Sequence, residues 1–447
     1  MTNRVGLNRL PGKFYPSLKT YLKRLSIAGI AILSLTALGC SENAMTDVSG
    51  TDNTDDISED TPSFNSSGIT SASIDPRLTT ANTEFAFKLF SQIYREQEEE
   101  NIFISPASIA FALAMTYNGA SGETQAAMAQ TLELQDMSLE DVNNAYELLK
   151  STLENIDPNV ELAIANALWS NLGVDFNPDF LTQTREFYQA DVTELDFSQP
   201  NAPATINNWV EQKTNGKIDG IVDRISPDTI LFLINAIYFQ GNWSEPFDAG
   251  ATTEQPFNSL DGSQTPHPLM SQTGEYQYLE NETFQAVSLP YGNGQFSFYI
   301  FLPKENVSLS QLVESINSEN WNNWINQLRL KPGSIQIPKF DLEYEITLND
   351  ALKALGMEVS FDRDRAEFSQ MKVPPPNLAI DRVKHKTFVE VNEEGTEAAA
   401  STSVGVVATS AREIEEPFNL KVDRPFFCVI RENQTETIVF MGSIVDP

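Results

Sequence analysis

Histidine and cysteine, which often act as bases, nucleophiles or metal ligands, are few in this chain of 447 residues. It contains two histidines, His267 and His385, and two cysteines, Cys40 and Cys428. These numbers argue against a histidine-based metal site and against a disulfide framework. A Gly-x-Ser-x-Gly elbow, a His-Glu-x-x-His motif and a P-loop are also absent from the sequence. We therefore expect no metal, no cofactor and no enzymatic activity; a hydrolase is the enzyme alternative.

The stretch from Glu394 to Glu416 is the unusual part of the sequence, because it is long, lacks proline and has almost no large apolar side chain. A structureless loop of ~20 residues inside a compact domain is usually functional. Two sets of residues alternate in its first half: the uncharged set is Thr396, Ala398, Ala400, Thr402, Val404 and Val406, and the more polar set is Glu397, Ala399, Ser401 and Ser403. In a strand the two sets face opposite sides, so this segment could enter a sheet with its uncharged face inward. The alternative is a plain flexible loop that is cleaved and released.

The sequence before this loop predicts helices in its first half and strands in its second half. Thr80–Tyr94 has an apolar stripe at helical spacing, and Ser105-Pro106 is typical of the start of a second helix, which should break at Asn118-Gly119. Later segments are predicted to be strands: Ile230–Tyr238, Phe296–Phe301, Ile335–Ile337, Val383–Val389 and Ile438–Met441. Cys428 should be a buried strand thiol. The fold class expected is α+β.

Several segments, in order along residues 78–447, resemble the serpin family, the serine-protease inhibitors. They are Asn101–Ile109, Asn118–Thr124, Ile206–Ile218, Asn235–Phe247, Val391–Thr402, Asp423–Phe427 and Phe440–Gly442. The resemblance implies one domain over residues 75–447, with three β-sheets, about nine helices and an exposed reactive-centre loop in a metastable fold. It also implies a monomer whose partners are target proteases.

The family's mechanism is suicide inhibition. A serine protease attacks the loop, and the freed arm then inserts into the main sheet and traps the acyl-enzyme. The hinge that enters first matches Gly395, Thr396, Glu397, Ala398, Ala399 and Ala400. A non-inhibitory serpin that acts as a binding or chaperone protein is the alternative.

The attacked bond in family inhibitors lies fourteen residues after the glycine that matches Gly395. This places the reactive bond at Thr409–Ser410. The small residues before it suit an elastase-like protease. The rival is Arg412, which would attract trypsin-like enzymes.

The resemblance also assigns supporting residues. Ser105, Ser108, Asn235 and His385 match the family's polar cluster beneath the strands that part, and Trp243, Lys339 and Glu393 match the region at the top of the sheet where insertion begins. The helix that binds heparin in some members corresponds to residues 137–156. Lys150 is its only basic residue here, so we expect no heparin binding.

The N-terminal residues 1–39 are basic and then apolar, as in an export signal. The apolar run is short for a permanent membrane span. It ends at Ala37-Leu38-Gly39-Cys40, which is similar to the lipobox of bacterial lipoproteins, although Ala37 stands where leucine is usual. We expect an exported lipoprotein with a lipid on Cys40, at the cell envelope or outside the cell. A cleaved signal without lipid and an uncleaved anchor are the alternatives.

Residues 40–74 are dominated by Ser, Thr, Asp, Asn and Gly, which predicts a disordered tether. The whole chain has 62 acidic against 29 basic residues, a formal net charge of -33. Such an acid excess argues against a nucleic-acid partner, because binding phosphates requires a cationic surface.

Overall fold

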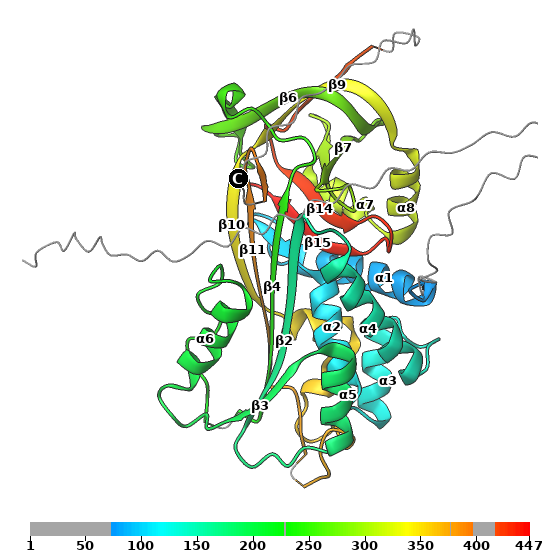
Figure 1. Ribbon diagram of the computed structural model, residues 1–447, viewed down its shortest axis with the longest axis vertical. Coiled ribbons are helices and arrows are strands. Elements are labelled where there is room, and N and C mark those ends of the chain that lie inside the picture. The colour runs from blue at the N-terminus through cyan, green and yellow to red at the C-terminus, as the bar shows by residue number, and fades with distance from the viewer. Residues whose placement is uncertain (1–72, 228, 376, 397–415) are drawn as a thin grey trace, which may run out of the picture. The chain divides into compact units, whose positions relative to one another are not determined.

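The computed structural model describes residues 73–227, 229–375, 377–396 and 416–447 (Figure 1). The signal, Cys40, nearly all of the tether and loop residues 397–415 lie outside this part. In the described residues the α-helices are α1 Pro76–Tyr94, α2 Pro106–Tyr117, α3 Gly122–Thr131, α4 Leu139–Asn155, α5 Pro178–Tyr188, α6 Ala202–Lys213, α7 Leu309–Ser315, α8 Ser318–Gln327 and α9 Asn349–Leu352. Three short helical turns, Ala249–Ala251, Lys353–Met357 and Glu358–Phe361, accompany them.

The described strands are β1 Ile102–Ile104, β2 Val160–Asn171, β3 Asp191–Leu195, β4 Leu231–Asn242, β5 Thr253–Asn258, β6 Gln264–Glu280, β7 Phe284–Tyr291, β8 Phe296–Pro303, β9 Arg329–Pro338, β10 Phe340–Thr347, β11 Arg382–Val391, β12 Gly395–Thr396, β13 Phe418–Lys421, β14 Phe426–Glu432 and β15 Ile438–Ile444. The helices and strands expected from the sequence lie within these bounds or overlap them. The α+β class is confirmed.

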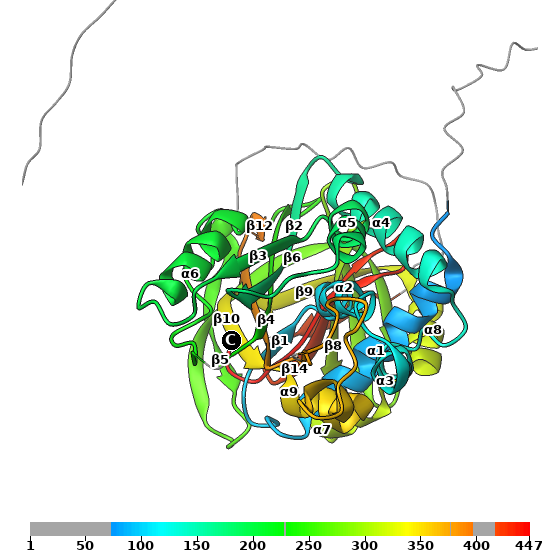
Figure 2. The same ribbon diagram turned by 90° about the horizontal axis from the view of Figure 1, so that it is seen from below.

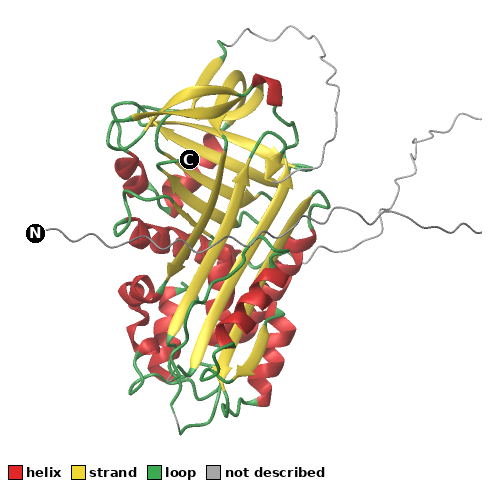
Figure 3. Cartoon of the chain, turned by 90° about the vertical axis from the view of Figure 1, so that its left-hand side faces the viewer, coloured by secondary structure: helices red, strands yellow, loops and turns green. Residues whose placement is uncertain are grey.

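Two hydrogen-bonded networks contain these strands. The central sheet has the order β10-β11-β4-β2-β3, with β12 added to β4. Figure 3 shows its long strands side by side. The second network has the order β1-β15-β14-β8-β7-β6-β9-β13, with β5 also paired to β6. The three expected sheets therefore form two networks, because the long strand β6 pairs with β7 near its end and with β5 and β9 along the rest.

The N-terminal end of α2 lies beneath the central sheet. Ser105 is the N-cap, and its hydroxyl accepts a hydrogen bond from the backbone N–H of Ser108 at 3.2 Å. Pro106 occupies the first turn, where its missing N–H costs nothing. Every residue of α2 is buried, and Asn118 is its C-cap. This explains why its apolar residues do not follow a single stripe.

The two faces of the central sheet are covered by different helices, with α2 and α6 on opposite sides of β4 (Figure 2). On one face, Leu231, Leu233, Ile237 and Phe239 of β4 join the main hydrophobic core, which includes α2. On the other face, Phe232, Ile234 and Ala236 join a smaller core that includes Ile206 and Val210 of α6. Since β4 is buried on both faces, its sequence from Leu231 to Phe239 is apolar apart from Asn235.

Candidate functional site

The four polar residues assigned to the cluster lie together beneath β4 and β11. These two strands are neighbours, and they pair in parallel from Phe232 with Arg382 to Tyr238 with Phe388. Asn235 and His385 lie opposite each other in this ladder, with Asn235 Oδ1 2.6 Å from His385 Nδ1. The other ring nitrogen, Nε2, accepts a hydrogen bond from the backbone N–H of Ser105 at 3.0 Å. The cluster therefore connects both strands to the start of α2.

His385 is neutral in this arrangement. Because Nε2 accepts from a backbone N–H, the ring proton is on Nδ1, which donates to Asn235 Oδ1. Complete burial lowers the pKa of His385 to about 3. The amide group of Asn235 in turn donates to the carbonyl oxygen of Ser108 at 2.9 Å and to its hydroxyl.

Asn166 extends the cluster and had not been predicted, and Thr387 adds a hydrogen bond between β11 and β1. Asn166 of β2 accepts a hydrogen bond from Asn235 Nδ2 at 2.6 Å, but its own amide nitrogen has no hydrogen-bond partner among the described residues. Thr387 of β11 donates to the backbone oxygen of Phe103 at 2.6 Å. The only available signal for Asn166 was an amide within an otherwise apolar segment. An unpaired buried amide costs about 1–3 kcal/mol, so this cluster is not fully satisfied in the closed sheet.

The three residues assigned to the top of the sheet also come together there. The Lys339 ammonium lies 2.7 Å from a carboxylate oxygen of Glu393, whose other oxygen accepts from the Thr252 hydroxyl at 2.8 Å. Burial raises the pKa of Glu393, but these hydrogen bonds lower it more, so the pKa lies below its ordinary value. Trp243 donates through Nε1 to the backbone oxygen of Asn392 at 2.9 Å.

The hinge begins at a glycine that no other residue could replace without strain. Gly395 has φ +143°, and a Cβ there would lie 2.2 Å from the backbone oxygen of Gly241. This close approach lets β12 pair antiparallel with β4, with Gly395 opposite Asn242 and Thr396 opposite Gly241. The first two hinge residues are therefore already paired with the end of β4.

That edge of β4 is the one shared with β11. A strand has two edges, and β2 occupies the other edge of β4 from Ser170 to Val160. Along the remaining edge, β11 pairs with residues up to Tyr238 and β12 pairs with Gly241 and Asn242. The hinge thus lies directly above the point where β4 and β11 meet.

The remaining predicted residues have simpler outcomes. The described residues do not include Cys40, Glu397, Ala398, Ala399, Ala400, Thr409 and Ser410.

Lys150 is buried and forms an ion pair with Glu154 in α4. Cys428 is fully buried in β14, and burial raises the pKa of its thiol. Within the described ranges, no helix is both long and apolar enough to span a membrane, and no group of three or more potential metal ligands is found.

Comparison with known proteins identifies the class. Residues 80–447 match the family model described as Serpin (serine protease inhibitor). The chain belongs to the serpin family, the serine protease inhibitors, and the serpin fold expected from the sequence is confirmed.

Similar curated proteins come from distant organisms. Human Serpin B8 is 36% identical over 377 residues, which cover 83% of this chain and 99% of that protein. Human leukocyte elastase inhibitor is 35% identical over 386 residues, which cover 83% of this chain and 100% of that protein. An uncharacterized serpin-like protein of Thermococcus kodakarensis is 36% identical over 373 residues, which cover 83% of this chain and 86% of that protein. Family membership alone therefore does not indicate a bacterial lipoprotein.

Solved structures share the same fold. The thermophilic serpin tengpin in its native state superposes with a TM-score of 0.77 and 33% identity, covering 84% of this chain and 95% of that chain. Human thyroxine-binding globulin in complex with thyroxine gives a TM-score of 0.76 and 28% identity, and the match covers 83% of this chain and 98% of that chain.

Proposed function

We propose that this protein is a suicide-type inhibitor of serine proteases that traps the acyl-enzyme by inserting its cleaved loop between β4 and β11. The observation that carries this proposal is the position of β12. Gly395 and Thr396 pair with the edge of β4 that β11 also uses, directly above their ladder. Continued growth of β12 would therefore separate β4 from β11.

The register of β12 supports insertion of the whole arm. If β12 continues antiparallel from Thr396 opposite Gly241, each following residue pairs with the preceding residue of β4. Val406 then comes opposite Leu231, the first residue of β4. The alternating segment thus matches the available edge of β4 in length.

The same register orients the two sets of side chains. Residues directly opposite each other in an antiparallel pair point to the same face. Ala398, Ala400 and Val404 would face the main core with Phe239, Ile237 and Leu233, which lie in that core already. The only charged residue of the arm, Glu397, would face the other side opposite the half-buried Gln240.

The polar groups of the cluster would also have hydrogen-bond partners after insertion. Thr402 comes opposite Asn235 in this register, and Asn235 is opposite His385 in the closed sheet. The inserted strand would separate the Asn235 amide from the His385 imidazole. The Thr402 hydroxyl, which can donate and accept, would bridge the two groups and replace their direct hydrogen bond.

The driving force would come from hydrogen bonds and packing. Insertion breaks one parallel ladder between β4 and β11 and forms two antiparallel ladders, one on each side of the new strand. The closed form is then metastable, because the loop cannot insert fully while it is held at both ends.

We further propose Thr409–Ser410 as the reactive bond and an elastase-like protease as the target. Thr409 would lie three residues beyond the end of the paired edge of β4, so the arm spans the sheet with little slack. Its side chain and that of Ala408 are small, which suits a small specificity pocket. The similarity to human leukocyte elastase inhibitor is consistent with this target class. Arg412, the rival, would leave three more residues of slack.

The decisive experiment mixes the full-length protein with pancreatic elastase and, separately, with trypsin. We expect a complex with elastase that survives boiling in denaturant, and its absence with an elastase whose catalytic serine is blocked. Cleavage of the loop without such a complex would contradict the trapping proposal.

A non-inhibitory binding function is the alternative, and the similarity to thyroxine-binding globulin in complex with thyroxine favours it. A carrier would bind its ligand without forming a covalent complex with any protease. The uncharged alternation from Thr396 to Val406 supports the inhibitor instead, because it suits an arm that enters a sheet.

We also propose that the protein is exported and held at the cell envelope through a lipid on Cys40. The order of basic residues, apolar run and Cys40 supports this location, and the polar residues 41–74 would provide a spacer between the lipid and the inhibitor domain. A monomer that does not bind heparin completes the proposal, since the lone basic residue of the corresponding helix, Lys150, is buried.

A further inference from the structure

The turn that follows β4 lies against the N-terminal end of the reactive loop. The backbone N–H group of Trp243 donates to the carbonyl oxygen of Glu394 at 2.9 Å, and that of Phe247 donates to the carbonyl oxygen of Glu393 at 2.8 Å. Glu394 directly precedes the hinge glycine Gly395. The position of the turn is therefore fixed relative to the point at which the loop begins.

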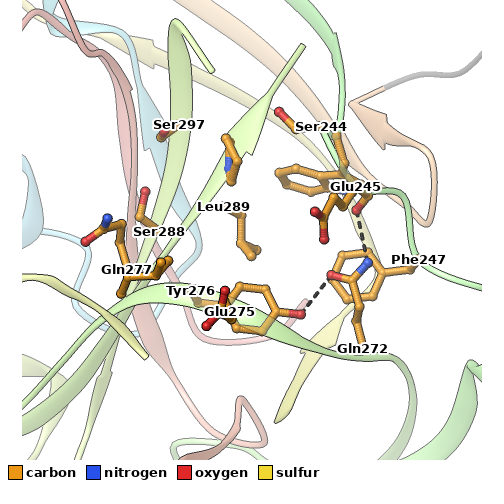
Figure 4. Close-up of a pocket in the computed structure, with 13 residues that line it drawn as sticks. Ser244, Glu245, Phe247, Gln272, Glu275, Tyr276, Gln277, Ser288, Leu289 and Ser297 are labelled. Atoms are coloured by element: carbon orange, nitrogen blue, oxygen red, sulfur yellow. Dashed lines mark hydrogen bonds between the residues drawn. The ribbon is translucent and has the colours of Figure 1, made fainter. Parts of the chain in front are cut away.

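The same turn is connected through β6 to the C-terminal end of the loop. The Tyr276 hydroxyl donates to Gln272 Oε1 at 2.9 Å, and Gln272 Nε2 donates to the backbone oxygen of Glu245 at 3.1 Å (Figure 4). The ring of Tyr276 also contacts that of Phe418, with ring centroids 6.0 Å apart. Phe418 begins β13, two residues after Glu416, the first described residue beyond the loop. The turn thus lies between the two described ends of the loop, and we call this part of the surface the loop face.

The loop face has an excess of negative charge. Its exposed carboxylates without an ion pair to any described lysine or arginine are Glu245, Asp248, Glu254, Glu394 and Glu416. Asp248 and Glu254 belong to it because they follow Phe247 and Thr252, which both bond to Glu393. Two cations on this face do not balance the charge: Lys339 is paired with Glu393, and Lys331 lies over the ring of Tyr278 at 5.8 Å.

We propose that the loop face is the docking surface for the target protease and that it favours a protease with an excess of positive charge around its active site. This inference rests on the proposed inhibitory function, since a protease that attacks the loop approaches the face from which both loop ends emerge. Complementary charges raise the rate of encounter and disfavour partners of like charge. The carboxylates need no fixed partner for this effect, because their field extends over about 10 Å at 0.1 M salt.

Cationic and anionic trypsin, which cleave after the same residue types and differ in net charge, test the proposal with the full-length Thr409→Arg protein. The quantity to measure is the second-order rate constant for cutting the loop, divided by each enzyme's rate on a small synthetic substrate. Trapped and released products are counted together, so the rate reports docking whether or not trapping follows. We expect cationic trypsin to react at least about tenfold faster at low ionic strength, and the ratio to fall toward one at about 0.5 M salt.

Charge-neutralising variants test whether the loop face is responsible. The triple variant Glu245→Gln/Glu254→Gln/Glu394→Gln should slow cationic trypsin by about threefold or more at low ionic strength and leave the rate at high salt unchanged. The melting temperature of the variant checks that it is folded.

A matched control removes the same number of charges elsewhere. Glu147→Gln/Glu186→Gln/Glu211→Gln changes exposed glutamates of α4, α5 and α6, which lie away from β6 and β9 (Figure 1). We expect this control to react nearly as fast as the protein without these changes. Equal rates for the two trypsins would overturn the proposal. An equal loss in both triple variants would overturn it too, since the net charge of the whole chain, and not the loop face, would then attract the protease. If the loop is cut with the expected salt dependence but no covalent complex forms, the docking surface stands and the trapping mechanism is rejected.

Discussion

The side chains of Asn235 and His385 are joined across β4 and β11 by a hydrogen bond of 2.6 Å, at the boundary that the proposed mechanism must open. Both groups are buried, and each also bonds to the start of α2. Opening the sheet must break this bond, so another partner must be supplied at the same time. If β12 grows in its present register, as we propose, Thr402 would become that partner.

Thr402 should therefore matter for trapping but not for the closed protein. Replacing it with valine keeps the shape and removes the hydroxyl, which would leave Asn235 and His385 without their bridge after insertion. The cost is about 1–3 kcal/mol in the inserted form. We expect more cleaved, inactive protein per trapped elastase, with an unchanged melting temperature of the intact protein. Ser403→Ala, which alters the opposite face, is the control; an equal loss in both variants would contradict the proposed register.

The hinge provides a sharper test of insertion. Ala398→Arg would carry a charge to the core face opposite Phe239, which is 2% exposed. We expect the loop still to be cut while the yield of covalent complex falls by about tenfold or more. Glu397→Arg introduces the same side chain one residue earlier, on the face that already carries a charge, and should retain most of the yield. If Ala398→Arg forms as much complex as the wild type, the arm does not insert in this register.

Cleavage should stabilise the protein if the closed sheet is metastable. Cutting the loop with a catalytic amount of elastase would let the arm add a strand to the central sheet, with new ladder bonds and packing. We expect the melting temperature to rise by about 10 °C or more. The cleaved Ala398→Arg variant should show little of this rise. Equal melting temperatures before and after cleavage of the wild type would favour the non-inhibitory alternative.

The burial of His385 predicts an acid-sensitive sheet. Its pKa is about 3 in the folded protein against an ordinary value of about 6.5 in the unfolded chain, so the neutral form is favoured by folding. The resulting stability is fully present above pH 6.5 and is lost as the pH falls toward 3. Between pH 6.5 and 4.5 the loss would be about 2–3 kcal/mol.

Urea unfolding of the full-length protein across this pH range measures the effect. His385→Gln should be less stable at neutral pH and should have a shallower dependence on pH in the same interval. The variant separates His385 from the many carboxylates, which titrate in both proteins. Parallel pH profiles would show that His385 does not contribute.

The attacked bond can be read from the released peptide. Complex formation with elastase should release residues Ser410 to Pro447, as determined by mass spectrometry. Thr409→Arg should shift inhibition toward trypsin while the trap is preserved, because the length of the arm is unchanged. A peptide beginning at Glu413 would assign the attacked residue to Arg412; the inhibitor proposal would then stand without the elastase preference.

Much of the site could be predicted from the chain alone. Side-chain alternation has a period of two in any strand, so the uncharged set from Thr396 to Val406 was visible without a structure. The capping of α2 by Ser105 follows from local chemistry, since a hydroxyl before a proline is a typical helix start. The serpin motifs then supplied the fold and assigned Asn235 and His385, with Ser105 and Ser108, to one polar cluster.

Local patterns could not determine which strands lie side by side. The long strand β2 was missed because its apolar residues, including several alanines, are equally consistent with a helix, and with it Asn166 was missed. The connection of two expected sheets through β6 depends on a strand long enough to pair with different neighbours along its length.

The tertiary structure decided the register. A pattern of period two fixes which residues share a face, but not which residue of β4 each one meets, because a shift of two preserves the faces. Only the packing of Gly395 against the backbone of Gly241 selects the pairing of Thr396 with Gly241. The proposed position of Thr402 opposite Asn235 after insertion depends on that pairing.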